Sequence, residues 1–245
     1  MNETVAVCYW GMTRSLNKIK NTHENNIYNV LKSNNYDYDI FIHTWKTKTK
    51  TQFVWLKETN VLIDEEEYKC INPNYYKIDV QDDFIDNIEF DKYFYEDQYK
   101  KYGVPRFNGK GEWIPQLLKN HLCALESLKR VYSMVKDTGK KYKYIIFVRP
   151  DAKFEKKIDI SLINNLEENE VLIQDRDHFN GYNDRFAVGH PYIMGKYANR
   201  IDEAIEFRKN IHRIDAESFC KYIINKYGKV KKAPIHFSLQ RPKLT

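Results

Sequence analysis

The sequence has little glycine, few cysteines and no long hydrophobic run. It contains 9 glycines and 4 cysteines in 245 residues. The cysteines lie far apart and form no Cys-x-x-Cys pair, which indicates buried free thiols rather than zinc ligands or disulfides; they are Cys8, Cys70, Cys123 and Cys220. No stretch approaches the ~18 apolar residues that cross a bilayer, and residues 1–10 lack the pattern of a signal peptide. We therefore expect a cytoplasmic protein without a transmembrane segment.

A strong excess of charge of one sign is also missing. The 40 basic and 34 acidic side chains give a formal net charge of +6, with the two signs interspersed. A dedicated nucleic-acid binder has a denser positive field, so we expect no stable nucleic-acid partner. Hydrophobic residues make up 42% of the sequence, which is enough for the core of one large α/β domain. No repeat or low-complexity linker divides it, so we predict a single domain over residues 1–245.

The order of apolar patterns predicts a mostly parallel sheet flanked by helices. A short apolar strand over residues 4–10, a helix over 17–32 and a second strand over 39–45 form a βαβ unit. The clearest helix covers 114–135, and the strongest strand, 144–148, follows it. Further expected strands cover 53–56, 61–63, 75–80, 171–173, 186–188 and 235–239, and further expected helices cover 196–211 and 216–227. Residues 81–102 are expected to form loops and short elements over the active site.

Charged residues follow two of these strands directly. The strand over 144–148 runs into Arg149-Pro-Asp151, and ligands of open α/β sheets bind outside the carboxyl ends of strands. Asp151 is placed to hold Mg²⁺ or Mn²⁺ on a diphosphate, and Arg149 suits a phosphate. A simple salt bridge between the two is the alternative. After the first strand, Gly11 allows close backbone approach and Arg14 supplies a cation for a nucleotide.

Other candidate metal ligands lie later in the sequence. Asp175-Arg-Asp177 is a literal Asp-x-Asp pattern and a rival metal site to Asp151. His236, in a late strand, is a candidate metal ligand, although a structural histidine is the more common role of such a residue. These assignments remain open at the level of sequence.

Two carboxylates are candidates for a catalytic role. Asp184 precedes a predicted strand, where a turn-forming residue is one interpretation and a residue that faces the site is the other. Glu217 begins a predicted helix and is a candidate general base for an inverting transfer, while a favourable interaction with the helix N-terminus is the alternative. His43 alternates with apolar residues on one strand face and is expected in the core or on a pocket floor.

Several of these segments occur together in one order, and together they resemble a known family. They are Gly11-x-x-Arg14, Asp39-Ile-Phe-Ile-His-Thr-Trp45, the strand from Tyr144 to Phe154, and Asn183-Asp-Arg-Phe-Ala-Val-Gly189. The sequence thereby resembles a group of GT-A-like glycosyltransferases of large DNA viruses, bacteria and algae, which for a viral protein implies the host cytoplasm. The resemblance covers most of the chain, with a gap at about residues 46–111.

The resemblance implies a GT-A-type, Rossmann-like fold and sugar transfer from a nucleotide-diphosphate donor, UDP- or GDP-linked, to a glycan or another hydroxyl acceptor. It implies a nucleotide-binding half over 1–115 and a metal and acceptor half over 116–245, with Mn²⁺ or Mg²⁺ at an Asp-x-Asp motif. It also implies that Asp184 faces the site and contacts the donor sugar or orients a substrate hydroxyl. This sequence departs from that motif, since Arg149 replaces the first Asp. Only one carboxylate, Asp151, then remains there for a metal.

Three other function classes compete with this interpretation. A nuclease pattern, Pro150-Asp151 with Glu155-Lys-Lys157, lies on one continuous segment, whereas nuclease sites draw the two parts from neighbouring strands. A nucleotidyltransferase begins with a glycine-rich loop after its first strand, and residues 11–15 contain one glycine. A non-catalytic module could bind polysaccharide or nucleic acid by stacking on some of the 19 tyrosines. Hydrolysis of a nucleotide-sugar would separate a transferase from this last class.

Overall fold

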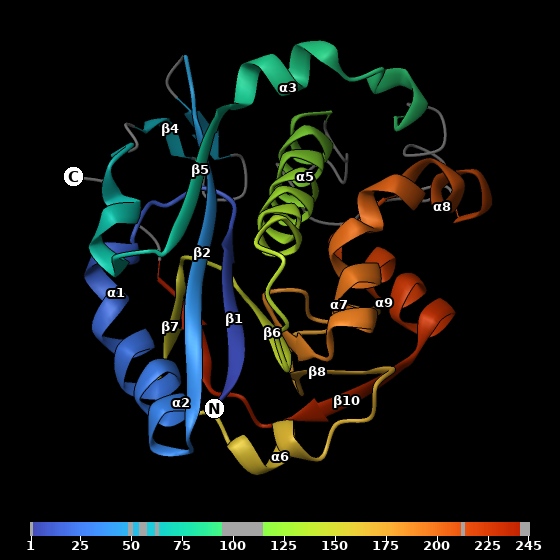
Figure 1. Cartoon of the computed structure of the whole chain (residues 1–245). Coiled ribbons are helices and arrows are strands. Elements are labelled where there is room, and N and C mark those ends of the chain that lie inside the picture. Colours follow the sequence, from blue (N-terminus) through green and yellow to red (C-terminus); the bar gives the residue numbers. More distant parts are fainter. Residues whose placement is uncertain are drawn as a thin grey trace.

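A seven-stranded sheet forms the centre of the molecule (Figure 1). The computed structural model describes residues 2–48, 51–53, 58–61, 64–94, 115–211 and 214–240. The sheet contains β1 (Glu3–Trp10), β2 (Tyr36–Lys46), β5 (Tyr75–Val80), β6 (Tyr144–Val148), β8 (Glu170–Gln174), β9 (Phe186–Gly189) and β10 (Lys229–Ala233). Their spatial order is β10-β8-β9-β6-β1-β2-β5.

Within this sheet, β9 runs antiparallel to both of its neighbours, while the other pairings are parallel. The predicted fold class, a mixed and mostly parallel α/β sheet flanked by helices, is therefore confirmed, and its assignment to the GT-A type stays a prediction. The predicted strands at 4–10, 39–45, 75–80, 144–148, 171–173 and 186–188 are confirmed as well. The division of function at residue 115 stays a prediction.

The central strands are buried because helices pack on both faces of the sheet. Along β1, Val5, Val7 and Tyr9 belong to one hydrophobic core, and the alternate residues Ala6, Cys8 and Trp10 belong to the other. This alternation follows from the two-residue period of a strand. A continuous apolar run, rather than an alternating one, is typical of such a doubly covered strand. β6 pairs with β1 in parallel, so the residues that follow the two strands lie at the same edge of the sheet.

Helices cover the two faces in separate groups. One face is covered by α1 (Leu16–His23), the π-helical turn η1 (Glu24–Tyr28) and α2 (Asn29–Ser33), which together confirm the helix predicted over 17–32. The other face is covered by α5 (Pro115–Asp137), α7 (Pro191–Ala198) and α9 (Ala216–Tyr227). Figure 1 shows α1 and α2 on one side of β1 and β2, with α5, α7 and α9 on the other.

Smaller elements complete the described part of the chain. Two further two-stranded sheets pair β3 (Thr51–Phe53) with β4 (Glu58–Val61) and β7 (Ala152–Phe154) with β11 (Phe237–Leu239). The short helical elements are η3 (Glu67–Ile71), α3 (Gln81–Asn87), η4 (Phe90–Lys92), α6 (Ile160–Asn164), η5 (Asn199–Glu203) and α8 (Ala204–Ile211). Residues 81–94 form short elements as expected, and the expected segment from 95 to 102 lies outside the described residues.

Three sequence expectations differ from the structure. The helix expected over 196–211 is observed as three elements: α7, which already begins at Pro191, the 3-10 turn η5 and α8. The strand β10 was not expected, because Lys229, Lys231 and Lys232 give it a polar sequence; it lies at the edge of the sheet, where lysine is common. The late strand expected over 235–239 is shorter, because β11 begins only at Phe237. Of the strands expected over 53–56 and 61–63, Phe53 and Val61 lie in β3 and β4, and the remaining residues lie outside the described ones.

The cysteines of the described residues are free thiols, as expected. Among the helices of the described residues, none combines the length and the apolar character needed to cross a bilayer.

Candidate active site

The predicted site residues come together at the carboxyl edge of the parallel strands. The register pairs Tyr9 of β1 with Val148 of β6, and Val148 with Phe186 of β9. The segments that follow β1 and β6, and the segment that precedes the antiparallel β9, therefore meet at one edge. Those segments carry Arg14, Arg149, Asp151 and Asp184, so the strand order explains why residues far apart in sequence share one place.

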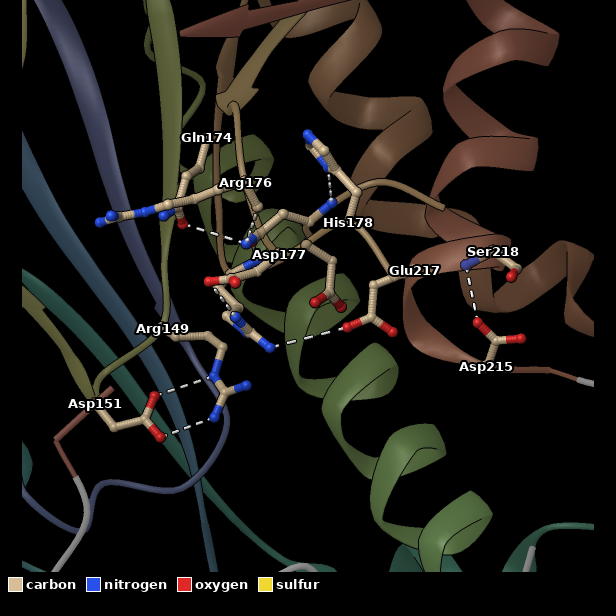
Figure 2. Close-up of polar contacts among 12 residues, drawn as sticks. Arg149, Asp151, Gln174, Arg176, Asp177, His178, Asp215, Glu217 and Ser218 are labelled. Atoms are coloured by element: carbon tan, nitrogen blue, oxygen red, sulfur yellow. Dashed lines mark hydrogen bonds and ion pairs between the residues drawn. The ribbon is translucent and has the colours of Figure 1, made fainter. Parts of the chain in front are cut away.

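Asp151 lies between two arginines. Its side chain is only 3% exposed. Arg149 donates from Nε to Oδ1 at 3.0 Å and from Nη2 to Oδ2 at 2.8 Å, and Arg14 donates from Nη2 to Oδ2 at 3.2 Å. Figure 2 shows the two parallel contacts between Arg149 and Asp151. This bidentate arrangement is the geometry that a guanidinium and a carboxylate favour, and it realises the salt bridge left open by the sequence.

A turn, rather than a continuing strand, produces this contact. β6 ends at Val148, and the Ala152 N–H donates to the Arg149 carbonyl at 3.1 Å. The Arg149 N–H donates in turn to the Arg185 carbonyl at 3.0 Å, which ties the turn to the segment before β9. Arg149 and Asp151 thus face each other across the turn and not merely along one face of a strand.

The turn after β1 is fixed by a buried hydroxyl. Gly11 has φ 91°, a backbone conformation that glycine adopts without steric cost. Its N–H donates to Oγ of Ser127 in α5 at 2.7 Å, and that hydroxyl lies 2.7 Å from Nδ1 of His43. His43 Nε2 contacts Asp79 at 3.1 Å. Ser127 was not predicted from the sequence, because serine inside a helix carries no local signal of such a contact.

His43 is a buried structural residue, in agreement with its expected place in the core. Its side chain is 0% exposed, and burial lowers its pKa to about 4. The neutral tautomer that donates from Nε2 to Asp79 accepts a hydrogen bond from the Ser127 hydroxyl at Nδ1, and that hydroxyl also lies 3.1 Å from the His43 carbonyl oxygen. Although Ser127, His43 and Asp79 lie in the order of a catalytic triad, Ser127 is also 0% exposed. The array is therefore inaccessible to a substrate and holds the Gly11 turn in place.

Asp184 and Glu217 form the acidic side of the site. Asp184 is 6% exposed and accepts from Nη2 of the buried Arg200 at 3.3 Å. Burial, and after it the negative charge of Asp184, raise the pKa of Glu217 from 4.5 to about 7. Arg185 lies 4.0 Å from Glu217 and opposes this rise. A carboxyl with a pKa near 7 is suited to accept a proton at neutral pH.

Arg149 links the two sides electrostatically. Burial alone would lower the pKa of Arg149, but the negative charge of Asp151 raises it. Asp184 and Glu217 raise that pKa as well, so the Arg149 guanidinium lies within the field of all three carboxylates. Figure 2 shows Glu217 extending from α9 toward the region between the strands and this arginine.

The loop between β8 and β9 is held by one buried amide. Asn183 is 1% exposed, and its side chain donates to Oε1 of Gln174 at 3.2 Å and to the Arg176 carbonyl at 3.1 Å. Its Oδ1 accepts from the Arg185 N–H at 3.0 Å, and its own N–H donates to Nδ1 of His178 at 3.1 Å. Because Asp184 lies between Asn183 and Arg185, these contacts fix the backbone that carries it.

Gly181 positions Glu217 through direct backbone contact. A Cβ atom on Gly181 would lie 2.0 Å from the carbonyl carbon of Glu217, which no side chain tolerates. The next residue, Tyr182, donates its N–H to the Glu217 carbonyl at 2.9 Å. The Asp215 side chain caps α9 by accepting from the Ser218 N–H at 2.9 Å (Figure 2). The backbone of Glu217 is thus held by the loop between β8 and β9 and by the capped first turn of α9.

His121 of α5 was also missed by the sequence analysis. Its Nε2 atom is buried and has no hydrogen-bond partner among the described residues. Burial lowers its pKa to about 4, and the charges of Asp184 and Asp215 act in the opposite direction. The ring is therefore a neutral group within the field of the acidic side of the site. The helical period of α5 reveals which apolar positions face the core, but it does not reveal that the Nε2 atom of a polar side chain such as His121 is buried near the site.

The part of the chain that the structure describes contains no cluster of three or more side chains suited to hold a metal ion, and Mn²⁺ or Mg²⁺ at Asp151 stays a prediction. Asp151 already accepts from two guanidinium groups. Asp175 and Asp177, the rival pair, are exposed on the loop after β8, where Asp177 contacts Arg185 at 3.4 Å. His236 lies half-buried between β10 and β11. The structure thus brings Asp151 together with arginines rather than with further metal ligands.

Comparisons with known proteins give likenesses among solved structures only. No family model matches the sequence, and no curated protein matches it. Among solved structures, the chain is similar to the galactosyltransferase LgtC, crystallised in complex with donor and acceptor sugar analogs. The alignment has a TM-score of 0.48 and 8% sequence identity, and it covers 94% of this chain and 73% of that chain. At this level of similarity, function has to be argued from the geometry of the site itself.

Proposed function

We propose that this protein is a glycosyltransferase that moves a sugar from a nucleoside-diphosphate donor to a hydroxyl group of an acceptor. One observation carries the proposal: two arginines and three carboxylates from four separate segments converge at the carboxyl edge of the central sheet. The cationic part, Arg14 and Arg149, suits a diphosphate. The acidic part, which contains Glu217, suits proton removal from a hydroxyl.

The donor half of the proposal rests on the segments after β1 and β6. The Gly11 turn is held open by its contact with Ser127, and it leaves space where a side chain would otherwise stand. A nucleoside diphosphate brings about two to three negative charges, and the guanidinium groups of Arg14 and Arg149 offset part of them. Phosphate binding at the turn that follows the first strand of an α/β sheet is a general feature of such folds.

The transfer step uses the acidic half. The acceptor hydroxyl oxygen forms a bond to the anomeric carbon while the bond from that carbon to the diphosphate oxygen breaks. The electron pair of the broken bond leaves with the diphosphate, and the hydroxyl proton passes to the Glu217 carboxylate. With a pKa of about 7, Glu217 is largely ionised just above neutral pH and can accept that proton. Asp184, fixed by Arg200, orients sugar or acceptor hydroxyls by accepting their hydrogen bonds.

The first test is a thermal-shift screen with UDP, GDP, CMP, dTDP and their common sugars, with and without Mn²⁺. One nucleotide should raise the melting temperature, because a ligand that binds only the folded state stabilises it. The matching nucleotide-sugar should then be hydrolysed or transferred, with release of free nucleotide. Folded protein that responds to no nucleotide but to polysaccharide would contradict the proposal and favour a non-catalytic binding module. The screen identifies the donor, while the acceptor and the viral, bacterial or algal origin stay predictions.

A further inference from the structure

The predicted metal ligand Asp151 already forms ion pairs with two arginines. Both oxygens of Asp151 accept from guanidinium groups, with Arg149 at 3.0 and 2.8 Å and Arg14 at 3.2 Å. A divalent ion binds to carboxylate oxygens at 2.0–2.6 Å, so it would have to displace these contacts. It would also stand beside two positive charges in a nearly buried place, where Coulomb repulsion is screened only weakly.

The other acidic groups of the site do not offer a substitute set of ligands. Asp184 is committed to the buried Arg200, and Asp177 contacts Arg185. Within the described ranges no three metal-binding side chains lie together. The residues present therefore fit a bound cation poorly, and they fit a bound anion well.

We propose that the two arginines replace a metal ion in this enzyme: Arg149 and Arg14 neutralise the leaving diphosphate, and Asp151 is a positioning residue that holds their guanidinium groups. This inference rests on the proposed transfer from a nucleoside-diphosphate donor. The two arginines and Asp151 together carry a net charge of +1, which attracts the diphosphate while the carboxylate prevents the two like charges from repelling each other apart.

The geometry of Arg149 suits this role in particular. It uses Nε and Nη2 on Asp151, and its Nη1 atom has no hydrogen bond among the described residues. A guanidinium has five N–H donors, so the two on Nη1 remain for a phosphate oxygen. Because Asp151 fixes the plane of the group in advance, little reorganisation is needed when charge develops on the leaving oxygen. The side chain is 22% exposed, which leaves it accessible to a ligand.

The decisive experiment measures nucleotide release by the unmodified full-length protein after dialysis against EDTA. The rate with the donor found in the nucleotide screen should change less than about twofold on removal of metal or on return of Mn²⁺ or Mg²⁺. A loss of about 100-fold or more in EDTA, restored by Mn²⁺, would overturn this inference and leave the glycosyltransferase proposal intact, since a catalytic metal typically supplies several kcal/mol. Absence of any nucleotide response, with or without metal, would overturn both.

Two variants test the roles of the individual residues. Arg149→Lys keeps the charge but loses the planar fork, and we expect kcat to fall about 10- to 100-fold with a smaller change in KM. The matched control is Arg176→Lys, an exposed arginine that donates to the Phe237 carbonyl at 3.3 Å and should leave the rate within about twofold.

Asp151→Asn keeps one acceptor oxygen for the arginines, so part of the metal-independent rate should remain. If this variant instead becomes inactive unless millimolar Mn²⁺ is added, or if Arg149→Lys behaves like the control, the assignment is wrong. Melting temperatures of all variants separate a loss of rate from a loss of folding.

Discussion

The raised pKa of Glu217 leads to a linked prediction for stability and activity. In the folded protein, burial and the neighbouring charge of Asp184 raise this pKa from 4.5 to about 7. The folded state therefore keeps a proton that the unfolded state releases near pH 4.5. Because the folded state binds more protons between these two values, its stability must fall as the pH rises from about 4.5 to 7. Replacement by Gln removes this titration and keeps the shape of the side chain.

The magnitude follows from the difference between the two pKa values. At about 1.4 kcal/mol per pKa unit, the rise from 4.5 to about 7 corresponds to about 3 kcal/mol. The free energy of unfolding of Glu217→Gln, relative to wild type, should therefore increase by up to about 3 kcal/mol between pH 4 and pH 8. Activity should move in the opposite sense, with a loss of about 10²- to 10⁴-fold at pH 8 if Glu217 is the base.

Urea unfolding at pH 4, 6 and 8 and initial rates of nucleotide release at pH 6 and 8 measure both effects. A pKa of about 7 means that roughly a tenth of Glu217 is ionised at pH 6 and nine tenths at pH 8, so the wild-type rate should rise about tenfold. The control is Glu206→Gln, an exposed carboxylate on α8 that contacts Asn210. If the free energies of unfolding of wild type and Glu217→Gln change with pH in parallel, burial does not raise the pKa of Glu217. An unchanged rate in the variant would refute the role as base.

Three further predictions follow from neighbouring contacts. Asp184→Asn removes a negative charge beside Glu217, so the midpoint of the pH–rate profile should move to lower pH; a midpoint that stays in place would contradict their electrostatic coupling. Ser127→Ala leaves the Gly11 N–H without its acceptor, so unfolding by urea should show a loss of about 1–3 kcal/mol, with a raised KM for the donor and an unchanged KM for the acceptor. Gly181→Ala forces Glu217 to move, so the melting temperature and the rate should both fall; a folded variant of normal activity would show that the loop yields without consequence.

Part of the fold follows from local pattern alone. The apolar run over residues 4–10 and the run over 144–148 predict buried strands, and the helical period over 114–135 predicts α5, because each pattern reflects the period of one element. The polar strand β10 could not be found in this way. Its place at the edge of the sheet depends on pairing with β8, and edge pairing imposes little on sequence.

Some features of the candidate site can likewise be predicted from local sequence, and others depend on the packing of the whole fold. Local pattern is enough to predict that Arg149 and Asp151 follow one buried strand and that Gly11 and Arg14 follow another, since the end of a strand is a local property. The folded structure is needed to see that Arg14 reaches Asp151 across 137 positions, that Ser127 holds the Gly11 turn and that Gly181 packs on Glu217. It also decided the electrostatics, because a pKa depends on burial and on charges brought near by the whole fold. The physical reason is that side-chain partners are set by packing between elements, and packing leaves no period in the sequence.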